Sequence, residues 1–177
     1  MSDTAQPELH YLEYYEEFLA KVRQLSRQII ASGWAPEFVI GVGRGGLVPA
    51  VYVSHQLGLP MLSIDHSSRL PGFADELLAK VATMSAAGSR LLFVDDINDS
   101  GGTITYIREL LSGNGCAADN LRFAVLINNQ RSQAQVDYWT DTIDRDEDKR
   151  WFVFPWESVG TQESIVEEAR SVPERLS

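Results

Sequence analysis

Three acidic residues and a run of small residues stand together in segment 94–103, which reads Val-Asp-Asp-Ile-Asn-Asp-Ser-Gly-Gly-Thr. Asp95 and Asp96 are adjacent, and Asp99 follows three residues later. The small residues after Asp99 are typical of a turn that opens a helix, where backbone N–H groups bind a phosphate dianion. Carboxylates just before such a turn suit the hydroxyl groups of a ribose, because ionised carboxylates accept hydrogen bonds. The segment therefore predicts a sugar-phosphate site.

An ordinary strand-to-helix turn is the alternative, because Asp, Ser and Gly are common in turns. That alternative explains any one of these residues taken alone. It does not explain the whole segment, because three carboxylates gathered at the end of a strand repel one another, and folding does not require them there. The complete segment favours a binding site.

A second glycine-rich segment, 41–46, reads Gly-Val-Gly-Arg-Gly-Gly and follows a predicted strand. It satisfies the dinucleotide-binding pattern G-x-G-x-x-G, and Asp65 ends the next predicted strand. Two features count against a nicotinamide cofactor. A long helix precedes the strand, and Arg44 stands inside the segment, where its guanidinium would meet a phosphate or pyrophosphate directly. A tight turn whose glycines only supply positive φ remains an alternative.

The composition is that of one globular domain, with 177 residues, 44% hydrophobic and 23% charged. The 15 basic and 25 acidic residues give a net charge of −10. That charge argues against duplex nucleic acid or an anionic membrane as a partner.

Cysteine and histidine usage excludes two kinds of site. Cys116 is the single cysteine, so no internal disulfide forms, and the three histidines lack the spacing of metal ligands. The start of the chain is polar and acidic, unlike a signal peptide, and no apolar run approaches the roughly 18 residues of a membrane span. We therefore expect a cytoplasmic protein.

Hydrophobic periodicity predicts an α/β fold, because strands and helices alternate along the chain. The expected helices are residues 11–31, 47–57 and 104–113, and the expected strands are 38–40, 61–65, 91–94, 122–127 and 136–139. We expect Pro49 in the first turn of its helix, where proline is tolerated. Ligands of such folds bind at the carboxyl ends of the strands. Both glycine-rich segments follow strand ends, so we expect them to line one crevice.

Two further segments differ from these elements. The connection 66–90 is long and has only a weak helical pattern over 74–82, so it is either a lid or a featureless connection. The segment 151–157, Trp-Phe-Val-Phe-Pro-Trp-Glu, is strongly aromatic, and a weak helical pattern follows from residue 161.

These segments carry a resemblance to a known family. The segment 94–103 resembles the phosphoribosyl pyrophosphate signature of the type I phosphoribosyltransferases, and residues 43–49 resemble their pyrophosphate loop. The aromatic segment 151–157 is similar to that of the bacterial xanthine–guanine phosphoribosyltransferases. The resemblance covers about residues 36–157.

The resemblance implies a type I phosphoribosyltransferase fold in a single domain, 1–177. Its central sheet is mainly parallel and flanked by helices over a core of about 36–140. A small hood stands at the carboxyl end, formed by about 141–160 with the N-terminal helix as a further candidate, and 161–177 is a tail.

The resemblance also implies roles for the site residues. Asp99 matches the acid near the purine N7, a candidate general base, and Asp95 and Asp96 match the pair that holds the ribose hydroxyls. The cradle for the 5′-phosphate matches Asn98, Ser100, Gly101, Gly102 and Thr103.

The remaining roles concern the pyrophosphate and the base. Arg44 and Gly45 match the pyrophosphate contacts, and Trp151 and Phe152 match the base-binding segment. Purine relatives place a lysine against the 6-oxo group after the fourth strand. Asn129 stands at that position here, with Arg131 as a substitute cation.

The implied reaction transfers a 5-phosphoribosyl group from phosphoribosyl pyrophosphate to a nucleobase, a 6-oxopurine, and releases pyrophosphate. It implies Mg²⁺ held mainly by the substrate, with Asp95 and Asp96 as candidate ligands, and a homo-oligomer, either a dimer or a tetramer. The alternatives are a non-catalytic or regulatory protein that only binds phosphoribosyl pyrophosphate or a nucleotide, and an NAD-dependent oxidoreductase.

Overall fold

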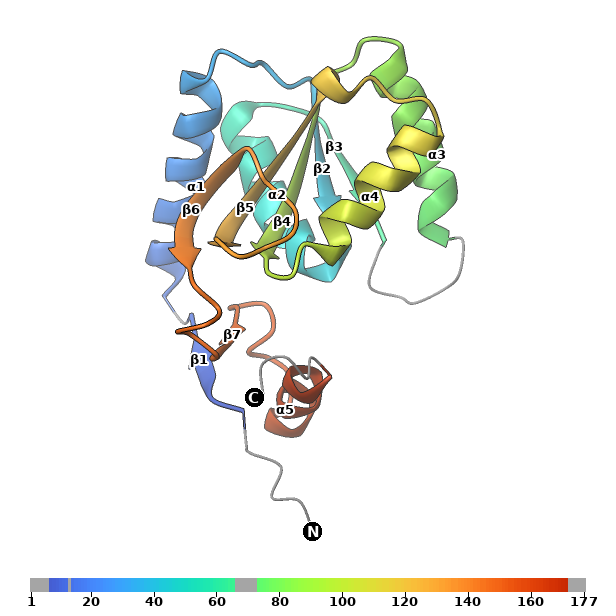
Figure 1. Ribbon diagram of the computed structural model, residues 1–177. Coiled ribbons are helices and arrows are strands. Elements are labelled where there is room, and N and C mark those ends of the chain that lie inside the picture. Colours follow the sequence, from blue (N-terminus) through green and yellow to red (C-terminus); the bar gives the residue numbers. More distant parts are fainter. Residues whose placement is uncertain (1–6, 13, 66–72, 172–177) are drawn as a thin grey trace. The chain divides into compact units, whose positions relative to one another are not determined.

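A computed structural model of the chain describes residues 7–12, 14–65 and 73–171 (Figure 1). The chain divides into two compact units. The larger unit is residues 21–143, and the smaller unit combines residues 1–20 with 144–177. Within the described residues, no helix is both long enough and apolar enough to cross a membrane.

The larger unit is built on a five-stranded sheet in the order β3-β2-β4-β5-β6, and every neighbouring pair is parallel. The predicted α/β fold with a parallel sheet is confirmed. Its strands are β2 (Phe38–Val42), β3 (Met61–Ile64), β4 (Leu91–Asn98), β5 (Leu121–Asn129) and β6 (Tyr138–Ile143).

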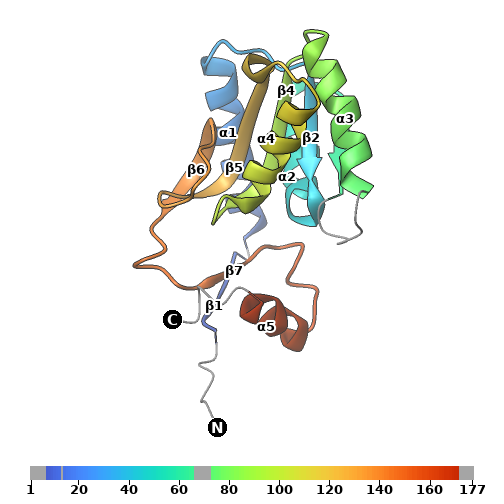
Figure 2. The same ribbon diagram turned by 45° about the vertical axis from the view of Figure 1, so that its right-hand side comes forward.

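Helices cover both faces of this sheet, as Figures 1 and 2 show. They are α1 (Tyr15–Ala31, which begins in the smaller unit), α2 (Gly43–Leu57), α3 (Phe73–Ala86) and α4 (Gly102–Gly113), with a short 3₁₀ turn, η1 (Ala118–Asn120). On the α3 and α4 face, Leu78 and Ile107 pack against Phe93 of β4 in one buried cluster. Both faces are apolar, because a parallel sheet is covered on both sides.

β4 is longer than the strand predicted over 91–94. It continues to Asn98 because its backbone stays paired with β5, with Asp95 opposite Val125 and Asn98 opposite Asn128. A backbone ladder does not require apolar side chains. The acids expected after the strand therefore lie in its second half.

α2 starts earlier than the helix predicted over 47–57. It begins at Gly43, so residues 43–46 form its first turn rather than a preceding loop. Glycine is a poor helix former, which is why the pattern places the start after these residues. Pro49, expected in the first turn, lies in the second.

The remaining boundaries differ by a few residues. α1 begins at Tyr15 instead of residue 11, β5 extends the strand predicted over 122–127 at both ends, and β6 lies closer to the C-terminus than 136–139.

α3 is longer than the weak helical pattern predicted over 74–82. Leu78, Val81 and Ala82 are buried in the core, and this packing stabilises the helix. It fills much of the connection 66–90, and residues 66–72 lie outside the described residues. The lid therefore stays a prediction.

The smaller unit contains a parallel pair that the sequence does not reveal, β1 (Leu9–Tyr11) with β7 (Trp151–Val153). Trp156 stacks on Phe154 with ring centroids 4.9 Å apart and meets Phe18 edge-on at 5.6 Å. α5 (Gln162–Arg170) follows this cluster. The predicted single domain with a hood over 141–160 stays a prediction.

Candidate active site

The turn between β4 and α4, residues 99–101, is the predicted phosphate turn. Gly101 is the N-cap of α4 and has φ 89°, a left-handed conformation that favours glycine. No capping side chain bonds the first turn of α4 from this position, although Ser100 Oγ accepts a long bond, 3.3 Å, from Gly102 N. The N–H groups of Gly102 and Thr103 therefore stand at a helix start, whose dipole attracts an anion.

The two acids of β4 lie just before this turn, and both are partly removed from water. Asp96 is 8% exposed, and Asp95 is half-buried. Burial raises the pKa of Asp95 well above its usual range, and the charge of Asp96 raises it further. Each carboxylate also accepts one backbone bond, from Asp96 N at 3.0 Å and from Ile97 N at 2.7 Å. Hydroxyl donors or a cation would relieve this repulsion.

The first turn of α2 lies directly against these acids. A Cβ on Gly45 would overlap the carboxylate of Asp96, whose carboxyl carbon would be 2.7 Å away. A Cβ on Gly46 would lie 2.8 Å from the Cα of Asp95. Both glycines are therefore required by close packing between α2 and β4. This contact confirms that the two glycine-rich segments lie together at the carboxyl ends of β2 and β4. It also explains Gly46, the last glycine of the pattern, and Gly45 beside it, without a dinucleotide.

Arg44 is exposed in the first turn of α2. A cation at a helix N-terminus is disfavoured by the helix dipole. An anion bound at the same helix start would reverse that disadvantage, because guanidinium and N–H groups bind phosphate oxygens together. The position of Arg44 suits the predicted pyrophosphate contact.

Asn98 directs its side chain inward. It is 2% exposed, its Nδ2 donates to Asn128 Oδ1 at 2.8 Å and to the Ala134 carbonyl at 2.7 Å, and its Oδ1 accepts from Ser132 Oγ at 2.9 Å. The side chain thus supports the loop after β5. A phosphate contact for Asn98 stays a prediction, and the backbone of Asn98 would have to make it, because the side chain bonds protein groups.

Asn129 also directs its amide to the protein. It is 6% exposed, its Nδ2 donates to the carbonyl of Asp99 at 3.0 Å, and its Oδ1 accepts from the Arg131 backbone N–H at 3.1 Å. Both polar ends of the amide thus have protein partners. The sequence does not reveal these partners. Aligning Asn129 with the lysine of purine relatives does not show which atoms the amide contacts.

The two aromatic residues predicted to bind the base belong to the smaller unit. The Phe152 ring is 8% exposed, with the guanidinium carbons of Arg145 and Arg150 at 5.0 and 5.8 Å from its centroid and His10 edge-on at 5.5 Å. Phe152 is therefore a core residue of that unit. Trp151 is half-buried. Their base contacts stay predictions.

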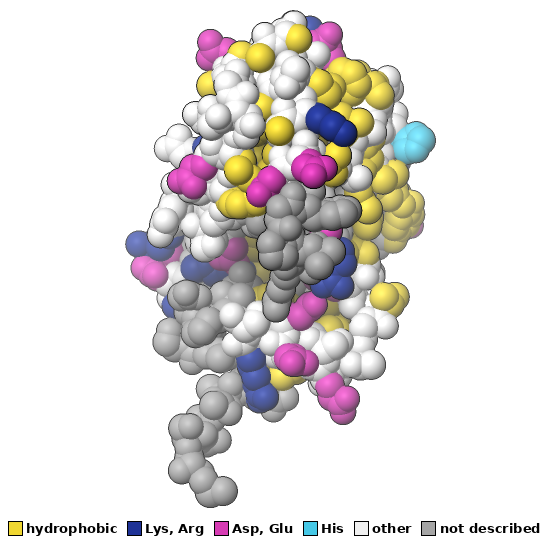
Figure 3. All heavy atoms as spheres, turned by 90° about the vertical axis from the view of Figure 1, so that its right-hand side faces the viewer, with side chains coloured by type: hydrophobic (Ala, Val, Ile, Leu, Met, Phe, Trp, Pro, Cys, Tyr) yellow, Lys and Arg dark blue, Asp and Glu magenta, His cyan; other side chains and the backbone are white. Residues whose placement is uncertain are grey.

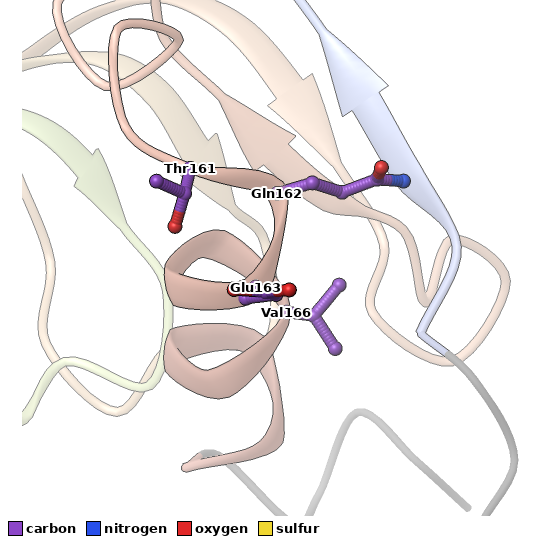
Figure 4. Close-up of a pocket in the computed structure, with 4 residues that line it drawn as sticks. All are labelled: Thr161, Gln162, Glu163 and Val166. Atoms are coloured by element: carbon purple, nitrogen blue, oxygen red, sulfur yellow. The ribbon is translucent and has the colours of Figure 1, made fainter.

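A hollow of about 470 Å³ in the smaller unit lies beside the start of α5 (Figure 4). It is lined by Thr161, Gln162, Glu163 and Val166. It includes none of the predicted site residues, and its one charged lining residue is an acid. We assign no phosphate chemistry to it.

The acids of β4 fit part of a magnesium site. Among the described residues, no group of three or more histidine, cysteine or acidic side chains is arranged to hold a metal ion. Mg²⁺ in phosphate chemistry is bound by one or two carboxylates together with substrate phosphates and water. Asp95 and Asp96 supply oxygen donors of that kind, so they suit an ion brought by a phosphate substrate.

Comparisons with known proteins agree with this geometry. Residues 10–159 match the family described as phosphoribosyl transferase domain. The xanthine-guanine phosphoribosyltransferase of Idiomarina loihiensis is 30% identical over 151 residues, which cover 81% of this chain and 84% of that protein.

Two solved structures have a similar fold. The purine phosphoribosyltransferase from Pyrococcus horikoshii has a TM-score of 0.63 and 26% identity, covering 85% of this chain and 95% of its own. The Helicobacter pylori xanthine-guanine-hypoxanthine phosphoribosyltransferase has a TM-score of 0.62 and 21% identity, covering 93% and 99%. At that identity, the second likeness concerns the fold alone.

Proposed function

The chain belongs to the phosphoribosyl transferase domain family and is a phosphoribosyltransferase, and from that premise we propose that it transfers the 5-phosphoribosyl group of phosphoribosyl pyrophosphate to a 6-oxopurine. Pyrophosphate is the second product. The resemblance to type I phosphoribosyltransferases is confirmed by the family match. The choice of a purine is supported by the names of the relatives, which are xanthine-guanine and purine enzymes.

One observation carries the proposal: the packing of Gly45 and Gly46 against the two acids of β4. It brings a helix start with an arginine beside a pair of carboxylates, and the chain continues from those carboxylates into the phosphate turn. Phosphoribosyl pyrophosphate consists of pyrophosphate, ribose and 5′-phosphate, joined in that order. The helix start with its arginine, the carboxylate pair and the phosphate turn follow one another in the matching order. In this proposal the larger unit alone binds all three parts.

The proposed chemistry is a displacement at C1 of the ribose. The bond from C1 to the pyrophosphate oxygen breaks as the bond from the base nitrogen to C1 forms, and the ring develops oxocarbenium character. Asp95 and Asp96 accept bonds from the ribose hydroxyls and hold negative charge near the cationic ring. Arg44 stabilises the departing pyrophosphate. Asp99 accepts the proton that leaves the base nitrogen. Mg²⁺, when bound, would offset charge on the pyrophosphate.

The test is a panel of free bases with phosphoribosyl pyrophosphate and Mg²⁺, scored by pyrophosphate release. We expect release with hypoxanthine or guanine and little with pyrimidines. Binding of phosphoribosyl pyrophosphate without release for any base would favour the non-catalytic, regulatory alternative. Calorimetric binding of NAD with no binding of phosphoribosyl pyrophosphate would favour the oxidoreductase.

The predicted homo-oligomer has candidate contact residues in the larger unit. Leu47 and Val51 are four residues apart on α2, and each is 39% exposed. Leu62 on the edge strand β3 is 36% exposed. Figure 3 shows apolar side chains gathered at one edge of the face that it presents. We propose that Leu47, Val51 and Leu62 contribute to self-association. Sedimentation velocity, which compares the oligomeric state of the Val51→Glu variant with that of the wild type, tests this.

A further inference from the structure

The loop after β5, residues 130–134, is joined to the phosphate turn by backbone contacts. The Gln133 N–H donates to the Ser100 carbonyl at 3.1 Å. A Cβ at Gly101 would lie 2.5 Å from Ala134 N and 2.7 Å from Ser132 Oγ. The loop and the turn therefore touch backbone to backbone, with no room for a side chain between them. We call residues 130–134 the bracket loop.

The side chain of Asn98, at the end of β4, bonds the C-terminal half of the bracket loop. It is directly opposite Asn128 in the register of β4 and β5, and the two amides are bonded. Its remaining bonds go to the Ala134 carbonyl and the Ser132 hydroxyl, both in the bracket loop. The side chain is 2% exposed, so water cannot easily replace these hydrogen bonds, and breaking them would destabilise the fold.

Asn129 joins the bracket loop to the turn from the other end. Its amide nitrogen bonds the Asp99 carbonyl, and its amide oxygen accepts from the Arg131 N–H. One side chain thus spans the first residue of the phosphate turn and the second residue of the bracket loop.

Asn98 and Asn129 are buried polar residues at the carboxyl ends of two strands whose earlier positions are apolar. Val94 of β4 and Leu126 of β5, for example, are at most 1% exposed. Burying an amide is favourable only when its partners are well placed, and a satisfied buried network specifies one arrangement. The network therefore selects one position of the phosphate turn.

We propose that Asn98 and Asn129 are positioning residues, which fasten the phosphate turn to the bracket loop, and that Asn129 does not read the base. The catalytic consequence rests on the proposed function. Holding the Asp99 carbonyl sets the direction of the Asp99 carboxylate, and holding Ser100 and Gly101 sets the N–H groups that meet the phosphate. Both act through residues other than themselves.

The first test needs no ligand, because it measures amide hydrogen exchange in the free, full-length chain. Asn129→Ala removes both bonds, and Asn129→Asp keeps the acceptor for Arg131 but loses the donor to Asp99. We expect exchange in the peptide that spans residues 99–105 to accelerate about tenfold or more in both variants, since each breaks a buried bond. The Arg131 amide should lose protection only in Asn129→Ala.

A matched control is Asn120→Ala. The Asn120 amide also donates to a backbone carbonyl, that of Ser85, at 2.9 Å. Removing it should lower stability without accelerating exchange over 99–105. Unchanged exchange over 99–105 in both Asn129 variants, at equal folded fraction, would overturn the proposal.

The second test separates positioning from base reading. Asn129→Lys should raise kcat/KM for 6-oxopurines if residue 129 contacts the base. We expect the opposite, a fall of about tenfold or more with every base, because the lysine cannot bond the Asp99 carbonyl in the same way. We also expect the affinity for a nucleoside 5′-monophosphate to fall more than the affinity for inorganic pyrophosphate.

The two tests distinguish failure of this proposal from failure of the proposed function. A wild-type chain that releases no pyrophosphate with any base would refute the function, and the exchange experiment would still decide the positioning. A gain of activity in Asn129→Lys, with an active wild type, would refute the positioning alone.

Discussion

Two helix starts in this molecule are built in opposite ways. The N-cap of α5 is Thr161, whose hydroxyl caps the helix by accepting from Ser164 N at 3.2 Å. The N-cap of α4 is Gly101, which has no side chain to offer the first turn. The start of α5 is completed by its own N-cap, whereas the start of α4 is held from outside by the bracket loop. The N-cap of α5 accounts for a stabilising role, and the lack of a capping side chain at Gly101 supports the proposed phosphate site at the start of α4.

The largest expected effect concerns the residue two positions before each N-cap, which is Asp99 at α4 and the exposed Val159 at α5. Asp99→Asn should retain phosphoribosyl pyrophosphate binding and lower kcat by about 10²–10⁴-fold, because a general base is lost. Steady-state kinetics across pH would measure it. Val159→Ala and the exposed Asp119→Asn are controls that should keep full activity. A near-normal kcat for Asp99→Asn would make Asp99 a turn residue only.

The next effect concerns the N-cap glycine of α4. Gly101→Ala places a Cβ against Ala134 in a left-handed conformation, which costs about 1–3 kcal/mol. We expect loss of stability together with weaker binding of a nucleoside 5′-monophosphate. Gly113→Ala is the matched control, since no atom lies within 4 Å of its Cβ position. Equal phosphate affinity in Gly101→Ala and the wild type would show that this turn does not bind phosphate.

Asp95 offers a contrast between function and stability. Its pKa is raised by burial and by Asp96, so the folded chain binds that proton more tightly than the unfolded chain. The wild type should therefore lose stability as pH rises from the ordinary value of 3.8 toward the raised pKa.

Asp95→Asn removes this penalty. We expect a higher Tm than the wild type above that window and an equal Tm below it, measured by thermal unfolding. Binding of phosphoribosyl pyrophosphate should weaken about tenfold to hundredfold, because a charged hydrogen bond is lost. A lower Tm at neutral pH would show that the carboxylate stabilises the fold.

The smallest effect belongs to the start of α5. Thr161→Ala should lower the free energy of unfolding by about 1 kcal/mol, the usual contribution of an N-cap. Chemical denaturation would measure it, and phosphate affinity should not change. A loss of phosphate affinity in this variant would contradict the distinction between the two helix starts.

The two glycine-rich segments show what can be predicted from sequence. Segment 94–103 is contiguous, so its residue types alone place a turn and the start of a helix after Asp99. That the two segments lie close together follows from a rule about parallel sheets, because both stand at strand ends. Neither inference needs the position of any individual side chain.

Other features depend on side-chain positions or on distant pairing. The amide of Asn129 has the same chemistry whether it faces a base or the Asp99 carbonyl, so only the structure separates the two. The pairing of β1 with β7 joins two three-residue strands from opposite ends of the chain, too short for periodicity to reveal. The early start of α2 is hidden because its glycines are selected by packing on β4 and not by helix propensity.

The most direct measurement is a titration of the ¹⁵N-labelled wild-type chain with phosphoribosyl pyrophosphate and Mg²⁺, followed through the backbone amide resonances. We expect saturable shifts at residues 100–103, at the start of α4, and at residues 43–46, at the start of α2. The amides of residues 162–164, at the capped start of α5, should not move. Shifts confined to α5, or no saturable shift at either glycine-rich segment, would contradict the account. The carboxyl ends of β2 and β4 would then not be a phosphoribosyl pyrophosphate site.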